Sequence, residues 1–159
     1  MKNIYTDGSC SKNPGTGAFS IIIFNNNIVS YVYREDCEQT TNNREELKAI
    51  IKAIEYSKEN LEENFIIYTD SSYAERSIND WMYRWYYNDW KNSKNQIVEN
   101  LDLIKILYNH CNIEFPNFSI EKVKGHNGCI GNELADAAAT KNIKKIKEIF
   151  SRHDIKYIN

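Results

Sequence analysis

The chain has 159 residues, of which 42% are hydrophobic and 26% charged, and its formal net charge is −2. These values fit one globular domain with a sizeable core, and they exclude a membrane span because no apolar run is long enough. A small negative charge is not typical of a nucleic-acid binder, but a carboxylate metal site would add negative charge locally without excluding one. The four cysteines form no CxxC pair, which argues against a zinc site or a disulfide framework. The first apolar residues leave no room for a signal peptide, so we expect a cytoplasmic protein.

The first half of the chain predicts strands around one helix. Residues 4–6 form a short apolar run of residues that favour strands. Residues 18–24 and 28–33 flank three asparagines and should pair as an antiparallel hairpin, because there is no room for a crossover. Residues 42–60 carry an apolar stripe at helical spacing, and residues 65–69 predict the next strand. A helix between two strands indicates a β-α-β unit with parallel pairing.

The second half predicts several helices and one strand. The expected elements are a helical region at 78–91 that holds all three tryptophans, a polar break at 92–96, a helical stripe at 97–108, a strand at 118–123, a glycine-rich loop at 124–131 and a closing helix from 132 to about 141 that continues toward 150. No linker separates these elements. We therefore expect residues 1–159 to form a single domain, with a core at about 2–141 and a basic C-terminal extension at about 142–159.

One short motif occurs twice. Tyr5-Thr6-Asp7-Gly8-Ser9 recurs as Tyr68-Thr69-Asp70-Ser71-Ser72, and each copy follows an apolar run, so each strand should stop at its aspartate. If the two strands are parallel neighbours, Asp7 and Asp70 emerge at the same edge of the sheet. Two carboxylates at one place repel each other, and a divalent cation would remove that cost. The alternative is that both aspartates only form turns or cap helices.

Five motifs follow one another along the chain. They are Thr6-Asp7-Gly8-Ser9 with Asn13-Pro14-Gly15; Thr40-Thr41-Asn42-Asn43-Arg44-Glu45-Glu46-Leu47; Thr69-Asp70-Ser71; Val123-Lys124-Gly125-His126; and Gly131-Asn132-Glu133-Leu134-Ala135-Asp136. In this order and at these spacings they resemble the type I ribonucleases H. The resemblance covers nearly the whole chain. It implies an α/β ribonuclease H-like fold, with a five-stranded mixed sheet in the order 3-2-1-4-5 and helices on both faces.

The resemblance also implies an activity and a cofactor. The family hydrolyses the RNA strand of RNA–DNA hybrids with two divalent ions, normally Mg²⁺, and leaves 5′-phosphate and 3′-hydroxyl ends. Carried over by motif, the metal ligands are Asp7, Glu46, Asp70 and Asp136, and His126 assists proton transfer or product release. Carboxylate oxygens suit Mg²⁺, and Mn²⁺ is a possible substitute. Without the resemblance, Asp136 could be a solvated helix residue, and a lone histidine such as His126 is more often structural.

Further positions match substrate contacts in the family. By resemblance, Asn13, Asn42 and Asn43 contact the RNA strand, where amide groups can recognise the minor groove and 2′-hydroxyls. Thr41 and Asn100 match positions that hold a phosphate of the DNA strand, although Thr41 and Asn42 could equally cap a helix. Further DNA contacts are implied for Tyr73, Trp81 and Trp85, but at least one of the two tryptophans could instead pack within its own segment. The tryptophan segment departs from the family pattern, because Tyr86 and Tyr87 stand where many relatives have lysines. This departure predicts weaker affinity for the hybrid rather than loss of activity.

The basic C-terminal stretch has two interpretations. It contains Lys144, Lys145, Lys147, Arg152 and Lys156. The simpler interpretation is a solvated helix face or tail, and the alternative is a set of phosphate contacts.

Two adjacent glutamates require a choice between them. Successive helical residues are turned by about 100°, so Glu45 and Glu46 cannot both face the sheet. Glu46 borders the apolar stripe and directly precedes Leu47, as the motif requires, so we predict that it is the ligand. Glu45 should point outward and complete a capping box with Asn42.

Two other functions stay open from sequence alone. The chain could be another nuclease on this fold, such as a transposase or junction resolvase, or a hybrid-binding module without catalysis. The asparagine motif argues against the first, and the complete carboxylate set argues against the second. We expect a monomer that acts on an RNA–DNA hybrid away from any membrane.

Overall fold

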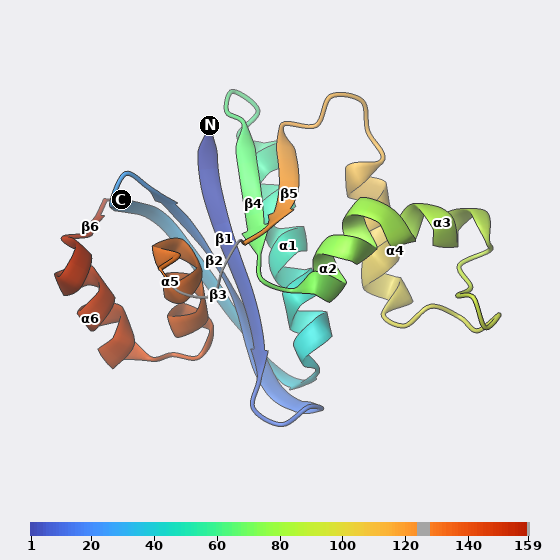
Figure 1. The fold of residues 1–159 in the computed structure, drawn as a ribbon, viewed down its shortest axis with the longest axis horizontal. Helices are drawn as coiled ribbons and strands as arrows, with labels where there is room; N and C mark the ends of the chain where they lie inside the picture. Colours follow the sequence, from blue (N-terminus) through green and yellow to red (C-terminus); the bar gives the residue numbers. More distant parts are fainter. Residues whose placement is uncertain (124–127, 159) are drawn as a thin grey trace.

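One mixed sheet forms the centre of the molecule. The computed structural model describes residues 1–123 and 128–158, and within them six strands pair in the order β5-β4-β1-β2-β3-β6 (Figure 1). The strands are β1 Lys2–Cys10, β2 Gly15–Asn25, β3 Ile28–Thr40, β4 Phe65–Thr69, β5 Phe118–Lys122 and β6 Lys156–Tyr157. β2 pairs antiparallel with β1 and β3, whereas β4 pairs parallel with both β1 and β5. The predicted order 3-2-1-4-5 is confirmed. A sixth, short strand, β6, pairs with β3 and was not predicted.

Helices cover both faces of the sheet, as predicted. They are α1 Asn42–Glu59, α2 Ser72–Arg76, the π-helical turn η1 Ser77–Trp81, α3 Met82–Tyr87, α4 Leu101–Cys111, α5 Ile130–Ala139 and α6 Ile143–His153. In Figure 1, α1 and α4 lie on one side of the sheet and α5 and α6 on the other. Two separate apolar cores result, a large one under α1 and α4 and a smaller one under α5 and α6.

The hairpin of β2 and β3 is longer than the apolar pattern predicted. β3 continues through the polar residues 35–39 to Thr40, because their backbone groups pair with the start of β2. Apolar alternation reports side-chain burial, so it missed strand residues whose side chains stay in solvent.

Two predicted helix boundaries are wrong for local reasons. Asn100 has a left-handed backbone with φ 58°, so α4 starts at Leu101 and not at residue 97. The predicted closing helix is divided into α5 and α6, because Lys141 has φ 54° and the Asn142 side chain accepts a hydrogen bond from the Lys145 amide (3.1 Å). Asparagine commonly begins a helix in this way.

The N-terminal end of α1 also differs from the prediction. Thr41 is the N-cap, and its hydroxyl accepts a hydrogen bond from the Arg44 amide at 3.2 Å. The N-cap is therefore Thr41 and not Asn42, so the predicted capping box between Asn42 and Glu45 is wrong. The apolar stripe itself is confirmed, since Leu47, Ile50 and Ile54 are fully buried.

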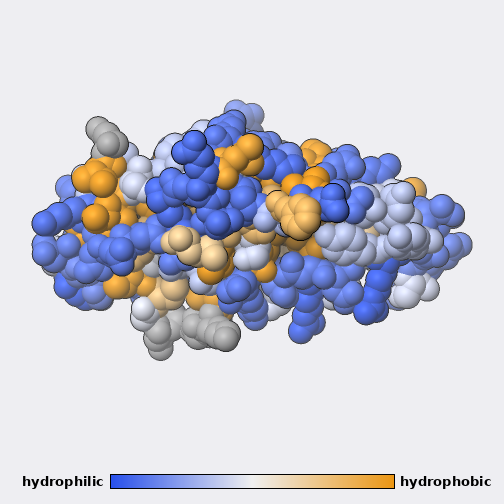
Figure 2. Space-filling model, turned by 90° about the horizontal axis from the view of Figure 1, so that it is seen from above, coloured by the Kyte–Doolittle hydropathy of each residue, from blue (hydrophilic) through white to orange (hydrophobic). Residues whose placement is uncertain are grey.

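The face seen in Figure 2 is mostly polar. Figure 2 shows a face on which small hydrophobic patches are separated by hydrophilic residues. Among the described residues, no helix is both long and apolar enough to cross a membrane.

Candidate active site

The two motif aspartates lie at one end of the sheet. β1 and β4 are parallel, with Tyr5 paired with Tyr68, so Asp7 and Asp70 follow at matching positions. β4 ends at Thr69 as predicted, but β1 continues past Asp7 to Cys10, because Asp7 still pairs with Ser20 of β2. The expectation that both strands stop at their aspartates is thus wrong for β1.

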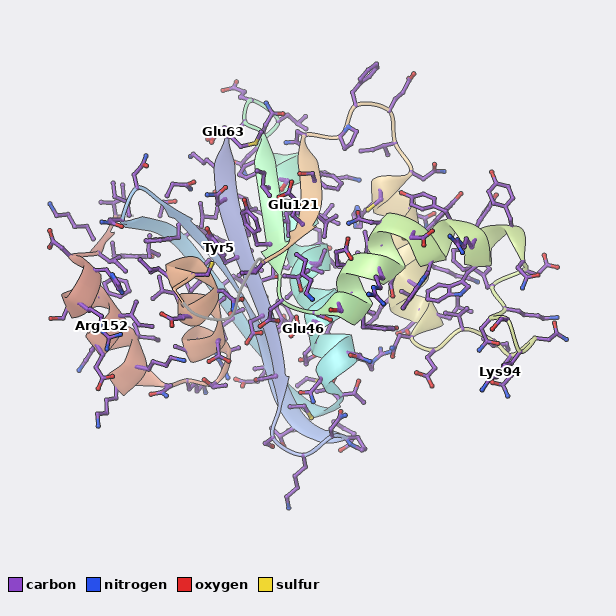
Figure 3. All side chains as sticks on the ribbon, viewed as in Figure 1. Tyr5, Glu46, Glu63, Lys94, Glu121 and Arg152 are labelled. Atoms are coloured by element: carbon purple, nitrogen blue, oxygen red, sulfur yellow. The ribbon has the colours of Figure 1, made fainter. Side chains whose placement is uncertain are left out.

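Glu46 reaches the same place because α1 lies very close to β1. A Cβ atom added to Gly8 would overlap the backbone of Glu45 and Glu46, so only glycine allows this approach. Figure 3 shows Glu46 between α1 and β1. One carboxylate oxygen from each of Asp7, Glu46 and Asp70 lies within 4.8 Å of the other two. Residues from two strands and a helix therefore form one acidic cluster.

Burial and mutual repulsion make this cluster unfavourable without a counter-ion. Asp7 is 5% exposed and Glu46 is 8% exposed. Burial, followed by the charges of Asp70 and Asp136, raises the pKa of Asp7 to about 8. Burial and the same kind of repulsion, from Asp7 and Asp70, raise the pKa of Glu46 well above its usual value. The Glu46 Oε2 atom is buried and has no hydrogen-bond partner among the described residues. An unpaired buried carboxylate oxygen beside two others is a donor set that fits a hard divalent cation.

Asp136 lies on α5, whose position is fixed by contacts to β1, β2 and β3. The Ser20 hydroxyl donates to the Ala135 carbonyl at 2.6 Å, and a Cβ atom on Gly131 would overlap the Tyr5 ring. Arg34 donates to the Ala138 and Ala139 carbonyls at the end of the helix. Small buried residues thus bring α5 close to the sheet near Asp7. Asp136 nevertheless lies outside the cluster of Asp7, Glu46 and Asp70. Its Oδ2 atom forms an ion pair with Lys145 at 3.2 Å.

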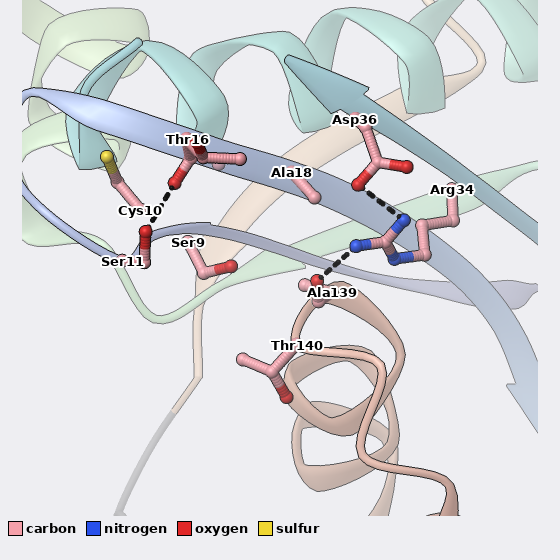
Figure 4. A pocket seen from close by; sticks show the side chains of 10 residues that line it. Ser9, Cys10, Ser11, Thr16, Ala18, Arg34, Asp36, Ala139 and Thr140 are labelled. Carbon is pink, nitrogen blue, oxygen red and sulfur yellow. Dashed lines mark hydrogen bonds and ion pairs between the residues drawn. The ribbon is translucent and has the colours of Figure 1, made fainter. Parts of the chain in front are cut away.

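A cavity beside α5 is lined by Arg34, which contacts that helix. It has a volume of about 270 Å³ and lies between the β1–β2 end of the sheet and the C-terminal end of α5 (Figure 4). Arg34 lines it and also binds Asp36 of β3 at 2.8 Å. Two of its guanidinium nitrogens therefore hold α5, and the third pairs with Asp36.

Glu45 does not point outward as predicted. Its side chain is fully buried, and Oε2 accepts a hydrogen bond from Thr40 (3.2 Å) and an ion pair from Lys48 (2.9 Å). The prediction failed because the first turn of α1 is wedged between β1 and the end of β3, so both sides of the helix are covered. The two adjacent glutamates still differ, since only Glu46 joins Asp7 and Asp70.

Comparison with known proteins agrees with this geometry. The RNase H family model matches residues 1–144. A ribonuclease H of Orientia tsutsugamushi is 42% identical over 137 residues, which are 86% of this chain and 79% of that protein. A ribonuclease H of Legionella pneumophila is 39% identical over 143 residues, which are 90% of this chain and 96% of that protein.

The chain belongs to the ribonuclease H family. A solved structure with the same fold is the foamy viral protease-reverse transcriptase in complex with an RNA/DNA hybrid. It has a TM-score of 0.75 and 22% identity, and the match covers 88% of this chain but only 19% of the viral chain. Metal dependence is general in ribonucleases H, and the acidic cluster of this member could hold a metal.

The predicted RNA contacts of this ribonuclease H lie together at the start of α1. Asn13, from the loop after β1, accepts a hydrogen bond from the Asn42 amide at 3.1 Å. Asn42 and Asn43 are both exposed. Three amide side chains therefore lie together at the start of α1, the helix that carries Glu46.

The predicted DNA contacts Thr41 and Asn100 lie on either side of Arg44, for which the sequence predicted no role. Asn100 donates to the Tyr73 hydroxyl at 3.0 Å and accepts from Arg44 at 3.4 Å. The Arg44 amide in turn donates to the Thr41 hydroxyl. Arg44 thus links the two predicted phosphate contacts, and its place inside the asparagine–glutamate motif was the only available signal.

The two predicted tryptophans continue from this group along the helices. Trp81 lies 6.4 Å from Tyr73 and 5.9 Å from Trp85, measured between ring centroids. A cavity of about 470 Å³ lies beside both tryptophans. His126 lies outside the described residues, and so does the rest of its motif from Lys124 onward.

Proposed function

We propose that this chain is a metal-dependent endoribonuclease that hydrolyses the RNA strand of RNA–DNA hybrids and leaves 5′-phosphate and 3′-hydroxyl ends. The observation that carries the proposal is the acidic cluster, in which one oxygen from each of three carboxylates lies within 4.8 Å of the others and a buried oxygen has no hydrogen-bond partner in the part of the chain that the structure describes. Membership of the ribonuclease H family supports the reaction class. The hybrid in the foamy viral structure supports the substrate class.

The carboxylates of Asp7, Glu46, Asp70 and Asp136 would hold two Mg²⁺ ions, or Mn²⁺ in their place. Bound ions supply the charge that activates the attacking water and stabilises the leaving 3′-oxygen of a phosphodiester. The protein supplies a frame in which Asp7 and Glu46 are buried between α1 and β1, whereas Asp70 is exposed to solvent. We assign His126 to proton transfer or product release, a role that suits the pKa range of histidine.

Selectivity for RNA would come from the α1 end of the site. Asn13, Asn42 and Asn43 offer amide donors and acceptors to 2′-hydroxyl groups, which distinguish RNA from DNA. The DNA strand would then lie along Thr41, Asn100 and Tyr73 toward Trp81 and Trp85. We propose that a monomeric domain of residues 1–159 performs the whole reaction.

A substrate panel tests the proposal. Labelled RNA is offered alone, paired with RNA and paired with DNA, with Mg²⁺ or with EDTA, and Asp70→Asn serves as the control variant. We expect cleavage only of the hybrid, only with Mg²⁺ and only by the unaltered protein, with 3′ ends that poly(A) polymerase extends. Equal cleavage of free RNA would contradict hybrid selectivity. Hybrid binding without cleavage at any Mg²⁺ concentration would favour a binding module, and cleavage of branched DNA would favour another nuclease.

A further inference from the structure

The last helix places a lysine on the fourth carboxylate of the proposed metal site. Lys145 Nζ lies 3.2 Å from Asp136 Oδ2, and the two side chains are 39% and 47% exposed. Lys145 is the first residue after the segment that matches the RNase H family model, which ends at residue 144. The lysine therefore comes from the C-terminal extension, whereas Asp136 lies in the part that matches the family model.

The position of Lys145 is fixed at both ends of α6. The Asn142 side chain accepts a hydrogen bond from the Lys145 amide, which holds the first turn. Further along, Ile149 is 3% exposed and packs with Phe150 in the smaller core, which holds the helix against the sheet. Figure 1 shows α6 beside α5, the helix that carries Asp136. The lysine therefore reaches Asp136 from an anchored helix and not from a free tail.

An ammonium group and a divalent cation compete for the same carboxylate. Each favours the ionised form of Asp136, but the two cations repel each other when both are within a few ångströms. The other charged groups that line the gap between α5 and α6 are Glu133, Lys144, Glu148 and Arg152. Glu133 and Glu148 offer Lys145 other acidic groups nearby when a cation takes Asp136.

We propose that Lys145 is a built-in counter-ion of Asp136 that sets the metal requirement of this chain. In the metal-free protein Lys145 holds the Asp136 side chain, and it must withdraw when a cation binds there, so it weakens binding of that cation. This inference rests on the proposed function, because it takes Asp136 as a metal ligand. Lys145 is a positioning residue, since it acts through Asp136.

The size of the effect follows from the exposure of the pair. Ion pairs at this level of exposure stabilise weakly, so displacing Lys145 should weaken cation binding by no more than about fivefold. Added salt screens exposed charges, so the effect should shrink as ionic strength rises.

The test measures Mn²⁺ binding without substrate, from the loss of the electron paramagnetic resonance signal of free Mn²⁺. Lys145→Met should tighten binding of the Mn²⁺ ion that Asp136 holds about two- to fivefold at low salt. Lys145→Arg keeps the charge and should match the unaltered protein. Lys147→Met is the matched control, because it removes the same charge from an exposed position on the same helix and should change Mn²⁺ binding less than Lys145→Met.

A second background separates the direct pair from a general change of charge. In Asp136→Asn, adding Lys145→Met should leave Mn²⁺ binding unchanged, as a double-mutant cycle requires for a pairwise effect. The proposal is overturned if Lys145→Met binds Mn²⁺ like the unaltered protein, or if its effect persists in the Asp136→Asn background. If the unaltered protein binds no Mn²⁺ at all, the proposed metal site itself fails, which is a separate result.

Discussion

The carboxylate site and the aromatic protrusion, defined as residues 72–98, differ in how their side chains are packed. At the site, Asp7 and Glu46 are buried beside like charges, and one Glu46 oxygen has no partner among the described residues. In the protrusion, Tyr86 stacks on Tyr108 of α4 with centroids 4.6 Å apart, and Trp90 meets the same ring edge-on. The rings of the protrusion pack on one another and on α4, whereas burial and repulsion disfavour the ionised carboxylates of the site. We take such a destabilising arrangement as a sign of a functional site.

The largest expected effect separates the two adjacent glutamates. Glu46→Gln should lower the cleavage rate by at least about 10³-fold, because losing a metal ligand removes several kcal/mol of transition-state stabilisation. Its metal-free stability should be unchanged or higher, because the substitution removes a buried charge that Asp7 and Asp70 repel. Cleavage assays and urea unfolding in EDTA measure the two effects.

Glu45→Gln is the matched control for this experiment. It should retain cleavage but lower the free energy of unfolding by about 1–3 kcal/mol, because the buried ion pair to Lys48 is lost. An inactive Glu45→Gln beside an active Glu46→Gln would contradict the assignment of the ligand on α1.

The second prediction concerns the pH dependence of stability without metal. Asp7 has a pKa of about 8 in the folded protein, whereas an unfolded aspartate has a pKa of about 3.9. Between these values the folded state retains a proton that the unfolded state has lost, so the Asp7 contribution to stability falls as pH rises from about 4 to 8. Asp7→Asn should reduce this slope, the remainder coming from Glu46, and urea unfolding in EDTA across that range compares the two proteins. Parallel pH profiles would show that Asp7 ionises normally.

The third prediction tests how far the protrusion depends on its aromatic packing. Tyr86→Lys should lower the free energy of unfolding by about 1–2 kcal/mol, because it removes the stack on Tyr108. Tyr87 is 85% exposed, so Tyr87→Lys should change stability by less than about 0.5 kcal/mol. If the protrusion lies along the DNA strand, Tyr87→Lys should also tighten hybrid binding at low salt and steepen the salt dependence by about one phosphate contact. Unchanged binding at low salt would place the DNA strand elsewhere.

The smallest effect concerns the proposed phosphate contact at Asn100. Asn100→Gly keeps the left-handed backbone but removes a side-chain hydrogen bond, so hybrid binding should weaken about fivefold. Asn26→Gly is the matched control, because Asn26 also has positive φ but lies in the turn between β2 and β3, outside the protrusion. Fluorescence anisotropy with labelled hybrid measures both. Equal binding by the two variants would remove Asn100 from the substrate contacts.

The sequence predicted what depends on local pattern and repeated motifs. The strand order, the hairpin and the buried stripe of α1 followed from periodicity and from the family motifs, and so did the meeting of Asp7, Glu46 and Asp70. The burial of Glu45, the left-handed turn at Asn100 and the pair between Lys145 and Asp136 did not follow. Each of these depends on how one element packs against another that is distant in the sequence, and helical spacing alone contains no such information.

Burial and mutual repulsion disfavour the charged form of the carboxylates in the site, and we propose that a divalent cation relieves both. Calorimetric titration with Mg²⁺ at pH 7, repeated in two buffers of different ionisation enthalpy, counts the protons released on binding. Because the pKa of Asp7 is about 8 and that of Glu46 is also raised, we predict net proton release, and less release from Glu46→Gln. Mg²⁺ binding without proton release, or no difference between the two proteins, would contradict the account.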